Sequence, residues 1–250
     1  LAPNACLRVL HIGDLHMERI THREKSVLKA IRELSPELVL FSGDVLNLSY
    51  LDDPIAQSHA IEFFSQITAP FGVFGVSGSP AVDSSEFFSR LSKETPLQWF
   101  DNQTLVIAQK SGFRLWGLTC SHNPDVDSKY IEGMKSQNNF NPGNFNILLY
   151  HSPDLAPHAS LLGFDLQLSG HTHGGQVRIP GFGALYAGSL YRKAFEAGRY
   201  RVNGMELYVT RGLGLEGAVA PRVRFLCRPE IVIWDIKGGE VSTFNLNLKY

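Results

Sequence analysis

The sequence predicts an α/β fold in which helices alternate with buried strands over the first half of the chain and strands predominate over the second. Two observations carry this prediction. Short apolar runs followed by glycine, such as residues 7–13 and 38–41, alternate with stretches whose apolar residues recur at helical spacing, such as residues 23–34. Beyond Ala184, apolar runs of strand length follow one another without helical periodicity. We therefore expect one domain, residues 1–250, that contains two sheets.

The elements of the first half each have a local cause. Residues 7–13 and 38–41 are short, mainly apolar runs, which are typical of buried strands. Between them, Val27 and Ile31 mark the apolar face of a helix that Pro36 ends. The other elements expected here are a helix over residues 55–67, a strand over residues 72–76 and a helix that follows an N-cap at Asp83 or Ser84.

The second half is expected to be richer in strands. Residues 121–146 contain many Asn, Asp, Ser and Gly residues without a clear period, so we expect a long loop or partly helical insertion that serves as a substrate-facing flap. A short helix over residues 155–162 separates the strand at residues 145–150 from the strand at residues 164–168. The other strands are expected over residues 104–109, 113–118, 184–187, 191–195, 205–210, 222–227, 230–236 and 241–246.

The composition is that of an ordinary globular protein, with 44% hydrophobic and 19% charged residues. The net charge of −1 provides no nucleic-acid-binding footprint, so we expect no nucleic-acid partner. Residues 190–230 contain eight arginines and lysines against four glutamates, which would suit an anionic substrate or line solvated strand faces. No run approaches the roughly 18 apolar residues of a membrane helix. The chain starts at Leu1 without Met, so peripheral membrane association through a segment absent from this chain is one expectation.

Histidines and carboxylates follow the predicted strand ends. His171 and His173 come directly after the run at residues 164–168, and residues i and i+2 of a strand point to the same side. The glycines that flank this pair permit a tight backbone that aims both rings at one point. The other strand ends carry Asp14 with His16, Asp44, the turn Gly78-Ser79-Pro80, and His151.

This set of side chains predicts a metal site, because open α/β sheets place their sites at the carboxyl ends of strands. Mixed carboxylate and imidazole ligands suit Mn²⁺, Fe²⁺, Co²⁺ or Zn²⁺ rather than Ca²⁺. A carboxylate such as Asp44 can bridge two ions, and two ions about 3.5–4 Å apart can clamp a phosphoryl oxygen and activate a bound water. We therefore expect one or two divalent metal ions and hydrolysis of a phosphate ester.

The order Asp14-x-His16, Gly43-Asp44, His151, Gly170-His171-x-His173 resembles the calcineurin-like metallophosphoesterase superfamily. The string from Gly170 to Pro180, with those at residues 207–214 and 228–231, is similar to the YkuE-like branch, which includes enzymes that act on the lipid precursor UDP-diacylglucosamine. The resemblance covers essentially the whole chain. It implies a four-layer αββα sandwich of two mixed β-sheets flanked by helices. It also implies hydrolysis of a phosphomonoester, phosphodiester or pyrophosphate, with a phosphorylated small molecule or lipid as substrate.

The resemblance further implies the roles of individual residues. It assigns four ligands to a first ion. Asp44 would also bridge to a second ion, which His151 and His171 bind. Asp44, His151 and His171 would be the catalytic residues. The ligands of the first ion would be Asp14, His16, Asp44 and His173. For Arg178 and Arg211, a role in binding the substrate phosphate is a hypothesis, and the alternative is a salt bridge on a strand surface.

The chain departs from the family pattern at one strand end. The usual Gly-Asn-His turn is replaced by Gly78-Ser79-Pro80, in which Ser79 is a poorer metal ligand and Pro80 has no proton to donate. Three interpretations remain open: an active enzyme in which water and another residue take these places, a one-metal or weakly active esterase, and a degenerate phosphate- or nucleotide-binding protein. We favour the active enzyme, because six of the usual ligands remain. Candidate substitutes, which could equally be ordinary loop residues, are Asn47, His122 and Asn123.

Overall fold

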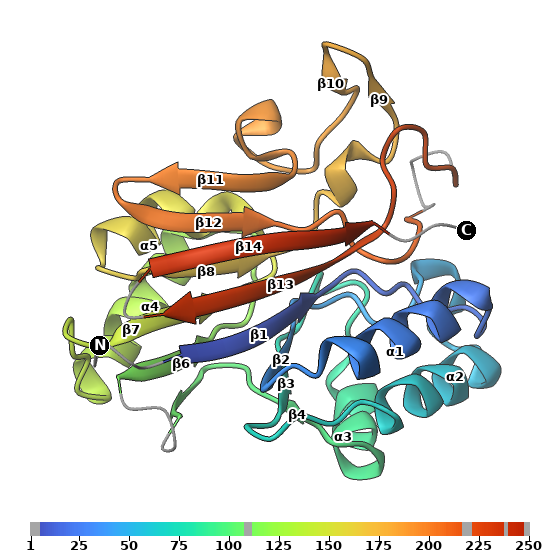
Figure 1. Cartoon of the computed structure of the whole chain (residues 1–250), viewed down its shortest axis with the longest axis horizontal. Helices are drawn as coiled ribbons and strands as arrows, with labels where there is room; N and C mark the ends of the chain where they lie inside the picture. Colours follow the sequence, from blue (N-terminus) through green and yellow to red (C-terminus); the bar gives the residue numbers. More distant parts are fainter. Residues whose placement is uncertain (1–5, 108–111, 217–221, 238–239, 248–250) are drawn as a thin grey trace.

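The computed structural model describes residues 6–107, 112–216, 222–237 and 240–247, except for the side chain of Glu240. Within these residues, two six-stranded sheets pack face to face, and helices cover the outer face of each sheet (Figure 1). The predicted four-layer αββα sandwich is therefore confirmed. No helix in the described part of the chain combines the length and the apolar character that a bilayer crossing requires.

The first sheet has the strand order β14-β13-β1-β2-β3-β4. Its strands β1 to β4 are mutually parallel, and β13 runs antiparallel to both β1 and β14. The strands are β1 (Cys6–Ile12), β2 (Leu38–Phe41), β3 (Val73–Gly75), β4 (Leu97–Trp99), β13 (Glu230–Lys237) and β14 (Glu240–Asn247). The helices that cover its outer face are α1 (His22–Leu34), α2 (Pro54–Ser65) and α3 (Ser85–Glu94).

The second sheet has the order β11-β12-β8-β7-β6-β5, in which β6, β7, β8 and β12 are parallel. The strands are β5 (Gln103–Val106), β6 (Phe113–Gly117), β7 (Phe145–Leu149), β8 (Leu166–Ser169), β11 (Gly198–Val202) and β12 (Met205–Val209). Its outer face is covered by α4 (Pro124–Gln137) and α5 (Ala156–Leu161). A small hairpin of β9 (Arg178–Ile179) and β10 (Gly183–Ala184) projects beyond the sandwich (Figure 1). Short 3₁₀ turns occur at η1 (Leu48–Tyr50), η2 (Pro153–Leu155), η3 (His173–Gly175) and η4 (Arg192–Phe195).

Strand alternation explains the layered core. In β1, Leu7 and Val9 enter the apolar layer between the sheets, whereas Leu10 and Ile12 pack under the helices of the first sheet. Both faces are thus largely buried, which is why apolar residues predominate on both faces of β1, interrupted by Arg8 and His11. Leu40 of β2 lies in the same inter-sheet layer and is completely buried.

Several sequence predictions of elements were wrong. Residues 121–146 contain a regular helix, α4, which agrees with the partly helical alternative. Because its Ile131 and Met134 are buried against the second sheet, the helix is not a flap. The strand expected at residues 191–195 is the 3₁₀ turn η4, and residues 222–227 form a single bridge between Phe225 and Val177. Short apolar runs do not distinguish these conformations by periodicity. The strand expected at residues 184–187 is limited to β10. The strands β4 and β11 were not expected. Part of the strand expected at residues 104–109 lies outside the described residues.

The inter-sheet layer predicts a clear stability difference between two leucines. Leu40→Ala should lower the free energy of unfolding by about 2–5 kcal/mol, because it removes buried methyl groups from a layer closed on both sides. Leu161→Ala is the matched control, since Leu161 is 78% exposed on α5 and should change stability by less than about 0.5 kcal/mol. Urea denaturation of both variants measures the difference, and equal losses would contradict the layered core.

Candidate metal centre

The ends of strands from both sheets bring two groups of side chains together. Asp14 and His16 follow β1, and Asp44 follows β2. His151 follows β7, and His171 and His173 follow β8. One group consists of Asp14, His16, Asp44 and His173, and the other consists of His122, His151 and His171. Within each group, the candidate ligand atoms all lie within 4.8 Å of one another.

The first group has the geometry of ligands around one ion. His16 Nε2 lies 3.0 Å from His173 Nε2 and 3.6 Å from Asp44 Oδ2. Asp14 Oδ1 lies 3.9 Å from His173 Nε2. Two atoms that each bind an ion at about 2.1 Å, at tetrahedral or octahedral angles, lie about 3.0–3.4 Å apart. The closest pair has this spacing and the other two pairs are somewhat wider, so the four side chains lie near the positions that ligands of one divalent cation take.

The electrostatics of Asp14 also indicate a cation. Asp14 is completely buried, and its Oδ2 has no hydrogen-bond partner among the residues that the structure describes. Burial raises the pKa of Asp14 to about 6 despite the nearby His151, and the charge of Asp44 adds to the rise. A buried carboxylate without a hydrogen-bond partner needs positive charge nearby to stay ionised, and a bound metal ion would supply that charge.

Asp44 lies between the two groups. Its Oδ2 is 3.6 Å from His16 Nε2 and 3.4 Å from His151 Nε2, so one oxygen atom faces ligands of both groups. Its Oδ1 accepts a hydrogen bond from the Ser79 backbone N–H at 2.7 Å, which fixes the orientation of the carboxylate. Burial opposes ionisation of Asp44, yet His151 and His16 hold its pKa well below the usual value.

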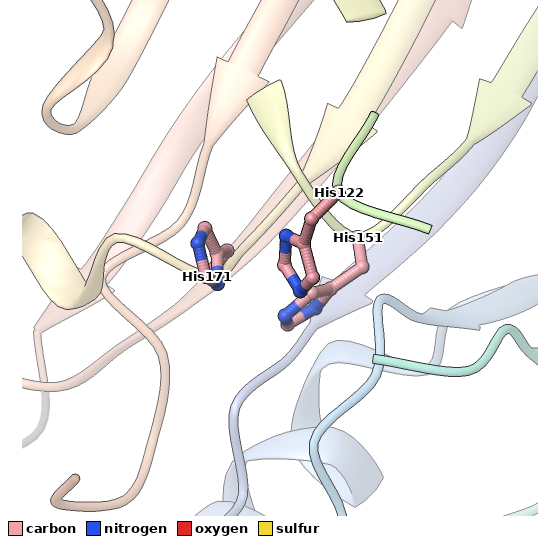
Figure 2. A group of neighbouring side chains, drawn as sticks. All are labelled: His122, His151 and His171. Atoms are coloured by element: carbon pink, nitrogen blue, oxygen red, sulfur yellow. The ribbon is translucent and has the colours of Figure 1, made fainter. Parts of the chain in front are cut away.

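Figure 2 shows the three rings of the second group, and hydrogen bonds to backbone carbonyls orient those of His151 and His171. His151 Nδ1 lies 2.7 Å from the carbonyl oxygen of Ser42, and donation to it leaves the Nε2 lone pair free for a metal. His171 Nε2 lies 2.9 Å from the carbonyl oxygen of Gly188, which leaves Nδ1 free in the same way. Burial and the charge of His151 lower the pKa of His171 to about 3, so this ring is neutral, as a metal ligand must be.

The backbone at these residues is held in an unusual conformation. Positive φ angles occur at six candidate ligands, namely Asp14, His16, Asp44, His122, His171 and His173. Non-glycine residues adopt this region rarely, and such conformations cluster at functional sites. Close packing of glycines makes the strand ends meet: a Cβ on Gly43 would lie 2.4 Å from Gly78 Cα, and one on Gly170 would lie 2.4 Å from Asp14 Oδ2.

Asp83 is a supporting residue that the sequence analysis missed. It was expected as a possible helix cap, but Ser84 caps α3 by accepting from the Phe87 N–H. The Asp83 carboxylate instead accepts three backbone N–H groups, from Asp44, Val45 and Gly78, at 2.7–3.0 Å. It therefore joins the loop after β2 to the turn after β3. The sequence carries no local signal for this contact, because the partners lie up to 39 residues away.

The end of the His-x-His-Gly-Gly-Gln string also has a structural role. The Gln176 side chain accepts from the Glu216 N–H and donates to the Glu216 carbonyl, both at 2.9 Å. This pairing brings Glu216 Oε2 to 3.5 Å from His16 Nδ1. Arg224 approaches the same group, with Nη2 3.4 Å from His173 Nδ1. Neither Glu216 nor Arg224 was expected at the site from the sequence.

The remaining candidates from the sequence occupy different environments. Ser79 Oγ lies 3.3 Å from both Asp44 Oδ2 and His151 Nε2, so it faces the second group, whereas Pro80 is exposed. Arg178 pairs with Glu196, and Arg211 pairs with Glu230; their role in substrate binding stays a prediction.

The three possible substitutes for the missing turn residues differ in position. The Asn47 side chain caps η1 and donates to the Leu215 carbonyl. The Asn123 side chain caps α4. His122 is the one of the three that lies in a group of candidate metal ligands.

The contacts of Asp83 predict an effect on metal binding. Asp83→Asn replaces one acceptor oxygen with a donor amide facing backbone N–H groups, so the Asp44 loop should shift and the affinity for Mn²⁺ should fall by about 10–100-fold. Ser84→Ala is the control: it should cost about 1 kcal/mol of stability through the lost cap of α3 and leave the Mn²⁺ affinity unchanged. Calorimetric titration checks both, and an unchanged affinity in Asp83→Asn would contradict this role.

Known proteins share both the sequence pattern and the fold. The calcineurin-like phosphoesterase family model matches residues 7–175. The metallophosphoesterase YkuE of Bacillus subtilis is 30% identical, over 92% of this chain and 79% of YkuE. The UDP-2,3-diacylglucosamine pyrophosphatase LpxG of Chlamydia trachomatis is 25% identical, over 91% of this chain and 82% of LpxG.

A solved structure agrees with these sequence matches. A dimetal phosphatase from Danio rerio superposes with a TM-score of 0.52 over 98% of this chain and 100% of that chain, at 10% identity, which shows a common fold. The family match confirms the resemblance that the strand-end residues indicated. This chain belongs to the calcineurin-like phosphoesterase family and is a metallophosphoesterase.

Proposed function

We propose that this metallophosphoesterase hydrolyses a phosphodiester or pyrophosphate bond with two divalent cations, one in each group of ligands. The observation that carries the proposal is the position of Asp44 Oδ2, which faces His16 of one group and His151 of the other. One carboxylate oxygen between two sets of imidazoles is the arrangement that a bridged pair of ions requires. The same chemistry can also hydrolyse a phosphomonoester.

The proposed ligands follow from the contacts. Asp14, His16, Asp44 and His173 would hold the first ion, and Asp44, His151 and His171 would hold the second, with Ser79 Oγ as a weak neighbour. Mixed oxygen and nitrogen ligands favour Mn²⁺, Fe²⁺, Zn²⁺ or Co²⁺.

The chain contributes orientation and charge. When bound, the two ions would lower the pKa of a bound water into the nucleophilic range and neutralise charge on the phosphoryl oxygens. The Ser79 N–H and the backbone contacts of Asp83 hold Asp44 at its position between the groups. The carbonyls of Ser42 and Gly188 keep His151 and His171 in the tautomers that leave one lone pair for a ligand bond. Because these contacts exist before substrate binds, the site is preorganised.

The surface beside His171 supports an amphiphilic substrate. Gly188, which accepts the hydrogen bond of His171, lies within three residues of Leu185, Tyr186 and Leu190, whose side chains are 56%, 74% and 66% exposed. We call the following exposed side chains the apolar rim: Ile179, Phe182, Leu185, Tyr186, Leu190 and Phe225.

The residues of the apolar rim come from two chain segments that pair with each other. The backbone of Phe225 forms hydrogen bonds with Gln176 and Arg178, in the segment that carries the other rim residues. Exposed apolar side chains gathered in this way mark ligand or lipid contacts. LpxG is named for a diacylated nucleotide-sugar substrate, and a lipid-linked pyrophosphate would place acyl chains on the rim and its phosphates at the ions.

Loss of the bridging carboxylate should abolish the reaction. In Mn²⁺-reconstituted protein, Asp44→Asn and His171→Ala should lower metal content and reduce turnover of bis-p-nitrophenyl phosphate by about 100-fold or more. The control His22→Ala alters an exposed histidine at the start of α1 and should change neither quantity. Elemental analysis and product release measure both. Wild-type protein that binds Mn²⁺ and substrate but releases no product would contradict hydrolysis and favour a binding protein.

The apolar rim predicts a change in substrate preference. Replacement of Tyr186 and Leu190 by Ser should lower kcat/KM for a diacylated UDP-sugar in mixed micelles, relative to kcat/KM for bis-p-nitrophenyl phosphate, by about tenfold. The reason is that only the acylated substrate offers surface for these side chains to bury. Leu161→Ser, on the exposed side of α5, should leave the ratio unchanged. A ratio that stays constant in the double variant would argue against a lipid substrate.

A further inference from the structure

The second group lacks a strong ligand on the side of the Gly78-Ser79-Pro80 turn. There, Ser79 offers a hydroxyl, which is a weak metal ligand when neutral. An ion held by Asp44, His151 and His171 alone would have three protein ligands. Water could complete its shell, but a further protein ligand would bind the ion more tightly.

His122 lies beside both histidines of this ion and could supply the further ligand. Its ring centroid is 4.6 Å from that of His171 and 6.0 Å from that of His151, and the three rings offer ligand atoms within 4.8 Å of one another (Figure 2). His122 comes from the turn between β6 and α4, whereas the other two rings follow β7 and β8. It is exposed, while His151 is buried and His171 is half-buried, so it stands on the solvent side of the group.

Hydrogen bonds hold the His122 turn in place. Asp127 of α4 accepts from the Ser121 N–H and hydroxyl, and it also accepts from the hydroxyl of Tyr150. Tyr150 directly precedes His151, so one carboxylate ties the turn of His122 to the strand end that carries His151. Asn123 caps α4 on the other side of His122.

The conformation of His122 itself is consistent with a functional role. His122 has a φ of 59°, in the left-handed region that the other candidate ligands except His151 also adopt. Its Nδ1 lies 3.8 Å from Cys120 Sγ, which leaves Nε2 as the atom available to an ion. A strained residue held by a capped helix and a buried carboxylate is positioned more firmly than an ordinary loop side chain.

We propose that His122 is a ligand of the second metal ion and takes the place left open by the Gly78-Ser79-Pro80 turn. The second ion would then be bound by three imidazoles and the carboxylate of Asp44, a donor set that suits Zn²⁺, Co²⁺ and Mn²⁺. This inference rests on the proposed two-ion function. Its tests measure metal binding rather than turnover, so failure of either proposal can be recognised separately.

The first test is metal stoichiometry in a variant. Wild-type protein dialysed against Mn²⁺ should hold two ions per chain by elemental analysis. His122→Ala should keep the first ion with unchanged affinity and bind the second at least about tenfold more weakly in calorimetric titration. His22→Ala should match the wild type, because His22 is exposed on α1. Unchanged affinity for the second ion would overturn the proposal, even if turnover fell, since His122 would then act on the substrate instead.

The second test uses wild-type protein and so does not depend on a variant that folds. Diethyl pyrocarbonate modifies free imidazoles, and peptide mass mapping reports each histidine. His122 should react in metal-free protein and with one equivalent of Mn²⁺, and it should be protected once the second equivalent binds. His22 should react in all three states. Modification of His122 at full metal occupancy would overturn the assignment.

Discussion

The structure depends on two carboxylates buried beside each other. Asp14 and Asp44 sit at the ends of neighbouring parallel strands, almost without solvent contact, and Asp14 Oδ2 has no hydrogen-bond partner among the described residues. Like charges in a site of low dielectric repel strongly, and burial removes the hydration that would otherwise stabilise them. Four imidazoles, from His16, His151, His171 and His173, surround this pair. Two ionised carboxylates this close together need positive charge beside them. In the family to which the chain belongs, metal ions supply that charge.

The backbone around the site is shaped by this requirement. The strand ends must approach closely enough to share one centre, and glycines at Gly43, Gly78 and Gly170 leave the space that side chains would fill. Left-handed turns at the ligands aim the side chains inward at a conformational cost. The three backbone N–H bonds to Asp83 offset part of that cost and keep the loops after β2 and β3 together. The fold thus positions the ligands before any ion or substrate arrives.

The two groups of ligands differ in how they are built. The first draws on the ends of β1, β2 and β8 and is enclosed by buried side chains. The second includes the exposed His122, and its His171 contacts Gly188, which is close in the chain to residues of the apolar rim; in the proposed function, the substrate enters from this side. A change at the turn after β3 can be balanced by a residue from another loop, because a metal ion selects ligand atoms by position rather than by their place in the sequence.

The sequence by itself determined the strands that alternate with helices and the residues at their ends. These signals are local: apolar runs, glycines and His-x-His spacing act within a few residues, so Asp14, Asp44, His151, His171 and His173 could be picked out in order. The turn η4 and the contacts of Asp83 and Glu216 were decided by tertiary structure. Asp83 binds backbone groups as far away as Asp44, and His122 meets His171 from a different strand connection. Such contacts depend on how the sheets pack. A pattern within a few neighbouring residues does not show which residues far apart in the sequence will meet.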